Sequence, residues 1–316
     1  MTTITVFLEN AVPVFAPAAA QVARFRERLV ARGGAGFSVR TCRSEADFLS
    51  ALPETDIAVV WAFRQEWFDR APRLRAVCTP AAGRDYFRVV PPPGVELRYG
   101  SFHGAIMAET AAAAVLGFAR GLLPLAGAMR ADGGAADWPR PAFSAAARRV
   151  AGSTAVVLGF GHIGRAAGRS LHALGMRVIG VSRGEHPAPD WFAADDRLAT
   201  APALNSILPE ADYLLCFLPA TPDTDCLLDA SRLALLKPTA FLANFGRGNL
   251  IYEPALDAAL RAGRLGGALL DVFAHEPLPA DSPLRSAPNC WLLPHASAFA
   301  PEYLDLYFEE LASTLP

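Results

Sequence analysis

A glycine-rich turn in the middle of the chain constrains the fold more than any other feature. Residues 156–158 are apolar and β-type, residues 159–164 read Gly-x-Gly-x-x-Gly, and apolar residues then recur at helical spacing. Between a strand and a helix, Gly159 makes the tight turn, Gly161 lets the backbone approach a pyrophosphate, and Gly164 lets the helix pack on the strand. The helix N-terminus offers phosphates its N–H groups and the positive end of its dipole. This pattern predicts a dinucleotide-binding unit.

Strand and helix patterns alternate on both sides of this turn, which implies parallel sheets with helices on their faces. A last helical pattern at residues 301–315 follows the final strand pattern and is expected to pack back on the N-terminal part. We therefore expect an α/β protein with two Rossmann-like, doubly wound parallel-sheet domains. The first is a discontinuous substrate domain of residues 1–100 and 296–316, and the second is a dinucleotide-binding domain of residues 101–295. The expected strands lie at residues 4–8, 37–41, 57–61, 74–79, 95–99, 156–158, 176–181, 213–218, 240–244, 268–271 and 290–293.

Composition narrows the classes of function. The chain has 316 residues, 52% of them hydrophobic and 19% charged, as in compact globular proteins. A net charge of -2 gives no electrostatic reason to expect nucleic acid as a partner. The five cysteines show neither a Cys-x-x-Cys pair nor metal-ligand spacing, so we expect no metal site. Free thiols and the lack of a signal-peptide pattern lead us to expect a cytoplasmic protein.

The most apolar stretch is a long helical pattern at residues 104–130, in which Pro124 is expected to cause a kink. Glu109 and Arg120 interrupt it, so it leaves too short an apolar run to cross a bilayer. A helix that is apolar nearly all round is expected to be buried between domains or subunits. We therefore expect a homodimer that forms through the helix at residues 105–128, and a surface loop at residues 132–141.

Three polar residues follow expected strands of the second domain: Arg247, Glu276 and His295. A guanidinium is a charged fork that suits a carboxylate and a neighbouring carbonyl oxygen. An imidazole can give a proton to an oxygen that becomes an alkoxide during hydride delivery, and can take it back in the reverse direction. A carboxylate on the other ring nitrogen orients the histidine and favours its protonated form. Together the three residues predict a catalytic group at one edge of a nicotinamide site.

The strand that follows the glycine turn bears on the choice of cofactor. NAD-binding folds usually place an acid about 20 residues past the glycines, where it binds the ribose 2′-hydroxyl. Here that strand ends in Ser182 and Arg183. Ser182 can form a hydrogen bond with a 2′-phosphate, and Arg183 can form an ion pair with it. We therefore favour NADP(H). NAD(H) stays an alternative, because Arg183 could stack on the adenine and Glu185 is close in sequence.

Several motifs resemble those of the D-2-hydroxyacid dehydrogenase family along most of the chain. Besides the glycine turn, they are the segments 218–224, 245–248 and 270–279 and the pair Pro294-His295. Within the family, the chain most resembles the NADPH-dependent glyoxylate/hydroxypyruvate reductases. The resemblance implies that Arg247 binds substrate and that the His295–Glu276 pair handles the proton.

The resemblance also implies contacts that side-chain chemistry alone does not indicate. The substrate carboxylate is expected on the backbone N–H groups of Ala82 and Gly83, next to Arg84, which departs from the usual small or apolar residue. Arg84 is either a second contact for the anion or, as we favour, a solvated arginine. Trp61 resembles a substrate-side aromatic residue, with a place in the core as an equal alternative. Gly246 and Tyr252 also depart from the family pattern, without removing a catalytic group. The expected cofactor contacts are Gly159, Gly161, His162, Ile163, Gly164, Ser182, Arg183, Leu218, Pro219, Thr224, Phe245, Asp271, His295 and Ser297.

The leading hypothesis is therefore an NAD(P)H-dependent reductase that converts a small 2-keto acid, such as glyoxylate or hydroxypyruvate, to the D-2-hydroxy acid. The two domains are expected to close on the substrate about hinges near residues 99–104 and 294–299. Two alternatives stay open. One is a phosphoglycerate-type dehydrogenase, and the other is a non-catalytic NAD(P)-sensing protein that resembles corepressors with this fold.

Overall fold

The computed structural model describes residues 1–33, 36–125 and 140–315. The chain divides into two compact units. Unit 1 is Met1–His103 with the C-terminal segment from Phe299, and unit 2 is Gly104–Ala298. Each observed boundary lies three residues beyond the expected one, at 103 against 100 and at 298 against 295.

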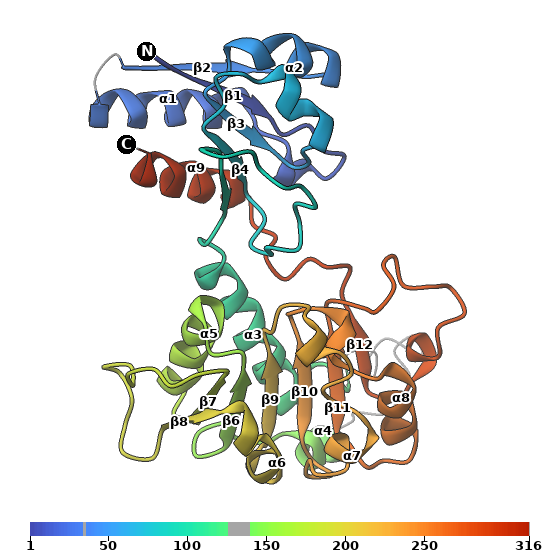
Figure 1. Ribbon diagram of the computed structural model, residues 1–316. Coiled ribbons are helices and arrows are strands. Elements are labelled where there is room, and N and C mark those ends of the chain that lie inside the picture. Colours follow the sequence, from blue (N-terminus) through green and yellow to red (C-terminus); the bar gives the residue numbers. More distant parts are fainter. Residues whose placement is uncertain (34–35, 126–139, 316) are drawn as a thin grey trace. The chain divides into compact units, whose positions relative to one another are not determined.

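Unit 1 is built on a parallel sheet of five strands in the order β2-β1-β3-β4-β5. The C-terminal helix α9 (Tyr303–Thr314) packs beside α1 (Ala19–Gly33) (Figure 1). Their contact combines the stacked rings of Phe25 and Phe308, 4.8 Å apart, with an ion pair between Arg24 and Asp305. The predicted discontinuous α/β fold of this unit is thereby confirmed. The strands are β1 (Thr2–Phe7), β2 (Phe37–Thr41), β3 (Ile57–Val60), β4 (Ala76–Thr79) and β5 (Glu96–Tyr99), and a further helix is α2 (Glu45–Ala51).

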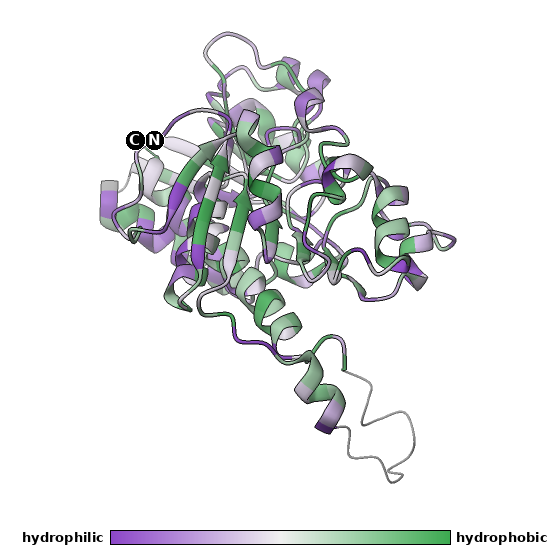
Figure 2. Ribbon diagram, turned by 90° about the horizontal axis from the view of Figure 1, so that it is seen from below, coloured by the Kyte–Doolittle hydropathy of each residue, from purple (hydrophilic) through white to green (hydrophobic). Residues whose placement is uncertain are grey.

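Unit 2 contains a parallel sheet of seven strands in the order β12-β11-β10-β9-β6-β7-β8. The chain runs outward from β6 to β8, then returns to β9 on the other side of β6, so the topological switch point lies between β6 and β9. Green, hydrophobic stretches run along strands in Figure 2, among shorter white and purple ones. The strands are β6 (Thr154–Leu158), β7 (Arg177–Ser182), β8 (Arg197–Thr200), β9 (Tyr213–Cys216), β10 (Phe241–Asn244), β11 (Gly267–Leu270) and β12 (Cys290–Leu292).

Strand β8 is not among the expected strands. All four of its residues are only half-buried and it lies at the edge of the sheet, so it lacks the buried apolar run that marks the other strands. Unit 2 also contains the helices α3 (Gly104–Ala119), α4 (Arg140–Ala146), α5 (His162–Ala173), α6 (Leu204–Ile207), α7 (Ala230–Leu233) and α8 (Glu253–Arg261).

The long helix expected at residues 104–130 is shorter in the structure. Helix α3 ends at Ala119, and Gly121 has a φ of 72°, a left-handed conformation that ends a helix. Residues 126–130 of the expected helix lie outside the described residues. Arg140 and Pro141 were expected in a surface loop but begin α4, where proline is tolerated in the first turn.

Helix α3 packs on α5 and on the sheet of unit 2, which accounts for its apolar character. Within the described residues, no helix is both long and apolar enough to span a bilayer.

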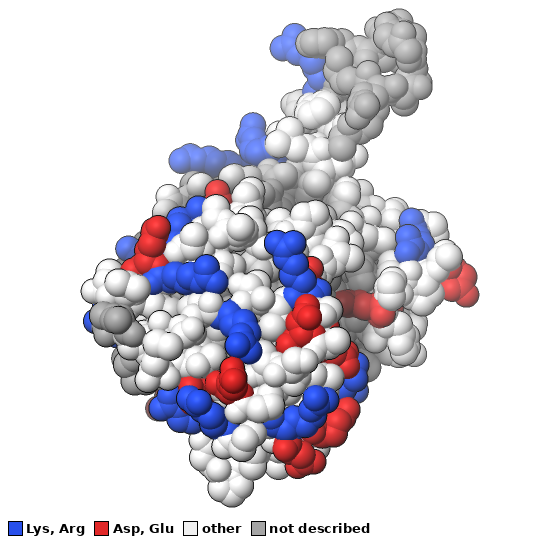
Figure 3. Space-filling view, turned by 90° about the horizontal axis from the view of Figure 1, so that it is seen from above, with Lys and Arg blue, Asp and Glu red and all other residues white. Residues whose placement is uncertain are grey.

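On the face seen in Figure 3, acidic and basic side chains are interspersed, which agrees with the small net charge.

Candidate active site

The glycine turn between β6 and α5 has the geometry that its sequence predicts. Gly159 has a φ of 96°, a region that residues with a side chain rarely adopt. A Cβ at Gly164 would lie 2.2 Å from the carbonyl oxygen of Gly159, so helix and strand approach too closely for any side chain. A Cβ at Gly161 would meet nothing within 4 Å. Gly161 therefore borders open space, as a residue that faces a ligand must.

Helix α5 begins directly at this open space. Gly161 is its N-cap residue, and no side chain caps the helix. The N–H groups of the first helical turn, which starts with the exposed His162 and the half-buried Ile163, have no acceptor within the helix itself. This arrangement suits the pyrophosphate of a dinucleotide.

Strand β7 ends at Ser182, next to the open turn. Arg183 is exposed, and the Ser182 hydroxyl donates to the carbonyl oxygen of Gly184 over 2.7 Å. Arg183 thus has the exposure that a contact with a 2′-phosphate requires. Since a phosphate accepts hydrogen bonds, the Ser182 hydroxyl would have to exchange its present bond for one that it donates to the phosphate.

The segment after β9 carries Leu218, Pro219 and Thr224. Leu218 is half-buried and Pro219 is exposed, whereas Thr224 is buried, with 9% of its surface exposed. The Thr224 hydroxyl accepts from the backbone N–H of Thr221 and lies 2.9 Å from the carbonyl oxygen of Pro219. Its hydroxyl therefore holds the shape of this loop, and a direct contact with cofactor stays a prediction.

Arg247 follows β10 in a loop that the buried Asn244 organises. The Asn244 side chain accepts from the N–H of Gly246 over 3.1 Å and donates to the carbonyl oxygen of Arg247 over 3.0 Å. A Cβ at Gly246 would lie 2.4 Å from the carbonyl oxygen of Leu218, so the departure from the family pattern at this position fits the close approach of two loops. The preceding Phe245 is buried and stacks on Phe217 at 5.6 Å.

His295 and Glu276 form the pair that the sequence predicts. The His295 Nδ1 lies 2.8 Å from Oε2 of Glu276, and since a carboxylate can only accept, Nδ1 donates its proton there. Oε1 of Glu276 accepts from the N–H of Phe273 over 3.0 Å, which fixes the carboxylate. The side chains are 51% and 36% exposed, so the second ring nitrogen of His295 can reach a ligand.

A fully buried carboxylate holds the backbone around His295. Asp271 accepts from the N–H groups of Ala296 at 2.6 Å and Ser297 at 3.0 Å, and its carbonyl oxygen accepts from the N–H of His295. His295 itself has a φ of 54°, a strained conformation for a residue with a side chain. Asp271 and the buried Ser297 thus shape the histidine loop, and their contacts with cofactor stay predictions.

The sheet brings the three expected catalytic residues to one edge. Strands β10, β11 and β12 are neighbours, with Asn244 opposite Leu270 and Leu270 opposite Leu292. Arg247, Glu276 and His295 follow the carboxyl ends of these three strands in turn. The glycine turn follows β6 at the same edge of this sheet. In open α/β sheets, ligands bind at this edge near the switch point.

Unit 1 carries the remaining expected residues at the carboxyl edge of its own sheet. Ala82 is exposed and Gly83 is half-buried in the loop after β4. Trp61 follows β3, is half-buried, and donates its indole N–H to the carbonyl oxygen of Phe15 over 2.9 Å. Only the ring of Trp61 is thus available to a ligand.

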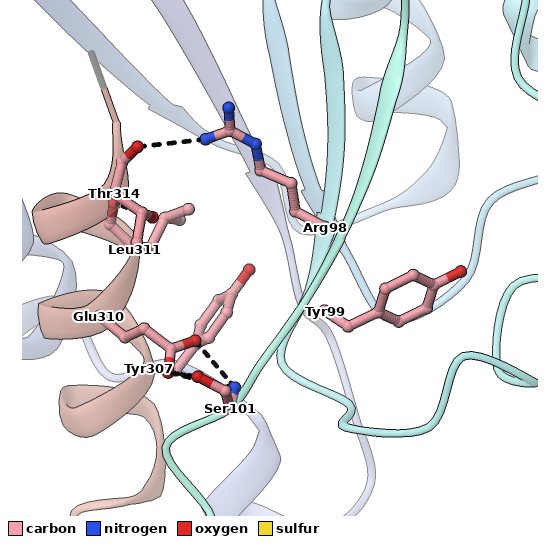
Figure 4. Close-up of a pocket in the computed structure, with 7 residues that line it drawn as sticks. All are labelled: Arg98, Tyr99, Ser101, Tyr307, Glu310, Leu311 and Thr314. Carbon is pink, nitrogen blue, oxygen red and sulfur yellow. Dashed lines mark hydrogen bonds between the residues drawn. The ribbon is translucent and has the colours of Figure 1, made fainter. Parts of the chain in front are cut away.

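A cavity of about 300 Å³ lies in unit 1 between β5 and α9 (Figure 4). None of the expected site residues lines it. The lining residues are Arg98, Tyr99, Ser101, Tyr307, Glu310, Leu311 and Thr314. Glu310 accepts from the backbone N–H and the hydroxyl of Ser101, so its carboxylate is already engaged.

Asn244, whose side chain bonds to the backbone of the arginine loop, is a site residue that was not expected from the sequence. A buried asparagine at the end of an apolar strand is the signal that could have indicated it, because buried amides need hydrogen-bond partners. Among the described residues, no group of three or more histidine, cysteine or acidic residues could hold a metal ion.

Known proteins that are similar to this chain are dehydrogenases and reductases of one family. The sequence profile of the family described as "D-isomer specific 2-hydroxyacid dehydrogenase, NAD binding domain" matches residues 112–297. A glyoxylate/hydroxypyruvate reductase B of Yersinia enterocolitica is 35% identical over 262 residues, which cover 80% of this chain and 77% of the relative. Its namesake from Pectobacterium carotovorum is 36% identical over 240 residues, 73% of this chain and 71% of the relative.

Two solved structures agree over nearly the whole chain. A D-isomer specific 2-hydroxyacid dehydrogenase family protein from Aeromonas salmonicida is 30% identical, with a TM-score of 0.73, and 98% of this chain and 94% of the other are covered. A D-isomer specific 2-hydroxyacid dehydrogenase from Xanthobacter autotrophicus, solved with NADPH and MES, is 28% identical, with a TM-score of 0.75 and coverage of 99% and 94%.

Proposed function

The chain belongs to the family of D-isomer specific 2-hydroxyacid dehydrogenases, and from this membership we propose that it reduces a small 2-keto acid to the D-2-hydroxy acid, with NADPH as the preferred cofactor. The enzyme is an oxidoreductase that acts on CH–OH groups and has a nicotinamide-binding domain. Relatives named glyoxylate/hydroxypyruvate reductase support glyoxylate and hydroxypyruvate as the first substrates to test. The hydrogen-bonded His295–Glu276 pair at the sheet edge is the observation that carries the proposal.

The residues of unit 2 fit a nicotinamide dinucleotide. The open space at Gly161 and the first N–H groups of α5 suit the pyrophosphate, and Leu218, Pro219 and Phe245 lie on the loops that follow the next two strands. When bound, the nicotinamide supplies the hydride that reduces the keto carbon. The chain itself has to position the acid and supply a proton.

His295 supplies that proton in the proposed mechanism. Since Nδ1 donates to Glu276, Nε2 is the atom that gives its proton to the substrate carbonyl oxygen as that oxygen becomes a hydroxyl. Glu276 stabilises the charged imidazolium and holds the ring in one orientation. In the oxidative direction, Nε2 takes the proton back.

Arg247 binds the substrate in this proposal, because its guanidinium can hold a carboxylate and a carbonyl oxygen at once. Asn244 holds the backbone of Arg247 and so positions it. The N–H groups of Ala82 and Gly83 are proposed as further donors to the carboxylate, and the ring of Trp61 as an apolar contact.

The preference for NADPH rests on Arg183. Its side chain is exposed beside the end of β7, where a 2′-phosphate would add a negative charge for it to pair with. A homodimer through the segment at residues 105–128 and a cytoplasmic location also stay predictions.

One assay tests the proposed function. Oxidation of NADPH and NADH is followed by the absorbance of the reduced nicotinamide, with glyoxylate, hydroxypyruvate, pyruvate, 2-ketobutyrate and phenylpyruvate as substrates. We expect turnover with NADPH to exceed turnover with NADH. His295→Ala should lower kcat by about 10²- to 10⁴-fold while cofactor affinity stays within about twofold, because a general acid contributes on that scale. Tight cofactor binding without turnover of any acid would refute the proposal and favour a cofactor-sensing protein.

A further inference from the structure

Aromatic side chains gather at the carboxyl edge of the sheet in unit 1. Phe15 follows β1, Trp61 follows β3, and Tyr86 lies in the loop after β4, so each comes from one of three neighbouring strands. The ring centroids of Phe15 and Trp61 are 5.0 Å apart, and those of Trp61 and Tyr86 are 6.4 Å apart. The rings therefore form one continuous surface, which we call the Trp61–Tyr86 surface.

Tyr86 is the member of this surface that is open to a ligand. The residue is 46% exposed, an unusual fraction for a large aromatic residue. Burial of part of the side chain raises the pKa of its phenol above the ordinary 10, so Tyr86 is uncharged at neutral pH. An uncharged ring adds no charge that would repel a carboxylate nearby.

The backbone ties Tyr86 to the loop proposed to bind the substrate carboxylate. The N–H of Tyr86 donates to the carbonyl oxygen of Gly83 over 3.1 Å, which closes a turn between the two residues. In a 2-keto acid, the side chain leaves the keto carbon, which is bonded directly to the carboxylate. An acid held at Ala82 and Gly83 would thus carry its side chain within reach of the Trp61–Tyr86 surface.

We propose that Tyr86, together with the ring of Trp61, contacts the side chain of the 2-keto acid, so that catalytic efficiency rises with the apolar size of that side chain. The inference rests on the proposed function and extends it from small acids to those with a large apolar or aromatic group. The indole N–H of Trp61 is already used by Phe15, so the surface presents mainly apolar ring atoms. Removal of such atoms from water favours an apolar side chain over the hydrogen of glyoxylate.

The test compares kcat/KM for phenylpyruvate and glyoxylate, with NADPH saturating, in wild type and in variants at Tyr86. We expect wild type to use phenylpyruvate at least about tenfold more efficiently, the scale on which an apolar contact discriminates between substrates. Tyr86→Ala should lower kcat/KM for phenylpyruvate by about tenfold and leave that for glyoxylate within about twofold. Tyr86→Phe, which keeps the ring, should behave as wild type.

A matched control is Val90→Ala, which removes an exposed apolar side chain from the same connection between β4 and β5. Val90→Ala should leave kcat/KM for both substrates unchanged. The inference is overturned if Tyr86→Ala leaves the ratio of the two efficiencies unchanged, lowers both equally, or is matched by Tyr86→Phe. Failure of wild type to reduce any acid would instead refute the proposed function, and the two failures are therefore distinguishable.

Discussion

Replacement of Gly161 by alanine is expected to change the affinity for the cofactor without changing the stability of the fold. Gly161 has a φ of -83° and a ψ of -154°, an extended conformation that alanine also adopts, and a Cβ there would meet nothing within 4 Å. The added methyl group would instead stand in the open space at the start of α5. Gly161→Ala should therefore weaken cofactor binding without disturbing the structure.

The expected change in stability is small because two effects oppose each other. Alanine is a poorer N-cap residue than glycine, at a cost below about 1 kcal/mol. It also lowers the conformational entropy of the unfolded chain, which stabilises by about 0.4–1 kcal/mol where the native backbone suits it. The net change should stay within about 1 kcal/mol, which corresponds to less than about 4 °C in Tm for a unit of this size.

The expected loss of cofactor affinity is much larger. A methyl group at the N-cap would hold the pyrophosphate away from the N–H groups of the first turn of α5. Loss of one hydrogen bond to a charged group costs about 1.5–3 kcal/mol. The Kd for NADPH should therefore rise by about 10- to 150-fold.

Fluorescence titration with NADPH and thermal unfolding without ligand measure the two effects separately. Two other glycines provide controls. Gly164→Ala should lower Tm clearly, because its Cβ would lie 2.2 Å from the Gly159 oxygen and overpacking costs about 1–3 kcal/mol. Gly36→Ala, at an exposed glycine of unit 1 with open space, should change neither quantity. A Gly161→Ala variant that binds NADPH as wild type does, or that unfolds at as low a temperature as Gly164→Ala, would refute this role of Gly161.

Two further predictions concern charged residues. Arg183→Ala should raise the Kd for NADPH at least about tenfold more than the Kd for NADH, because only the former carries a 2′-phosphate for the guanidinium to pair with; equal losses in the two titrations would count against this role. Hydrogen bonding to Arg197, together with the charges of Arg197 and Arg177, lowers the pKa of the Glu210 carboxyl below its ordinary 4.5. A carboxyl whose pKa is lower in the folded than in the unfolded state stabilises the fold at pH above its ordinary pKa. This contribution is lost as the pH falls through the pKa of the carboxyl in the folded state. Thermal unfolding of Glu210→Gln should therefore show a lower Tm than wild type at neutral pH, and the difference in Tm should disappear in acid. A difference in Tm that persists in acid would contradict this role of the Glu210 carboxylate.

Most of the fold could be predicted because its strands carry strong local signals. Buried parallel strands such as β6 and β10 read as short apolar runs, and these were found with small errors at their ends. Strand β8 has no such run, since it is half-buried at the sheet edge, and it was missed. The end of α3 at Ala119 was also missed, because the apolar composition continues past the point where Gly121 turns the chain.

The candidate site could be predicted as a set of residue types but not as a set of contacts. The roles of Arg247, Glu276 and His295 were expected from their chemistry and from the family resemblance, and the structure shows the 2.8 Å contact between Glu276 and His295. The positioning role of Asn244 was not expected, because nothing in an apolar strand says which loop a buried amide bonds to. The engagement of the Asp271 carboxylate by Ala296 and Ser297 was not expected either.

The glycine turn, the alternation of strands and helices, and the family of the chain can all be read from the order of the residues. These features depend on neighbouring residues, such as the tight backbone at Gly159 that only glycine adopts readily. That β10, β11 and β12 are neighbours, and hence that Arg247, Glu276 and His295 share one edge, follows from the three-dimensional fold alone. Pairing of parallel strands joins residues far apart in the chain, and no local pattern encodes which strand lies beside which. The proximity of Tyr86 to Trp61 is a consequence of strand order in the same way, since the two residues follow adjacent strands of the other sheet.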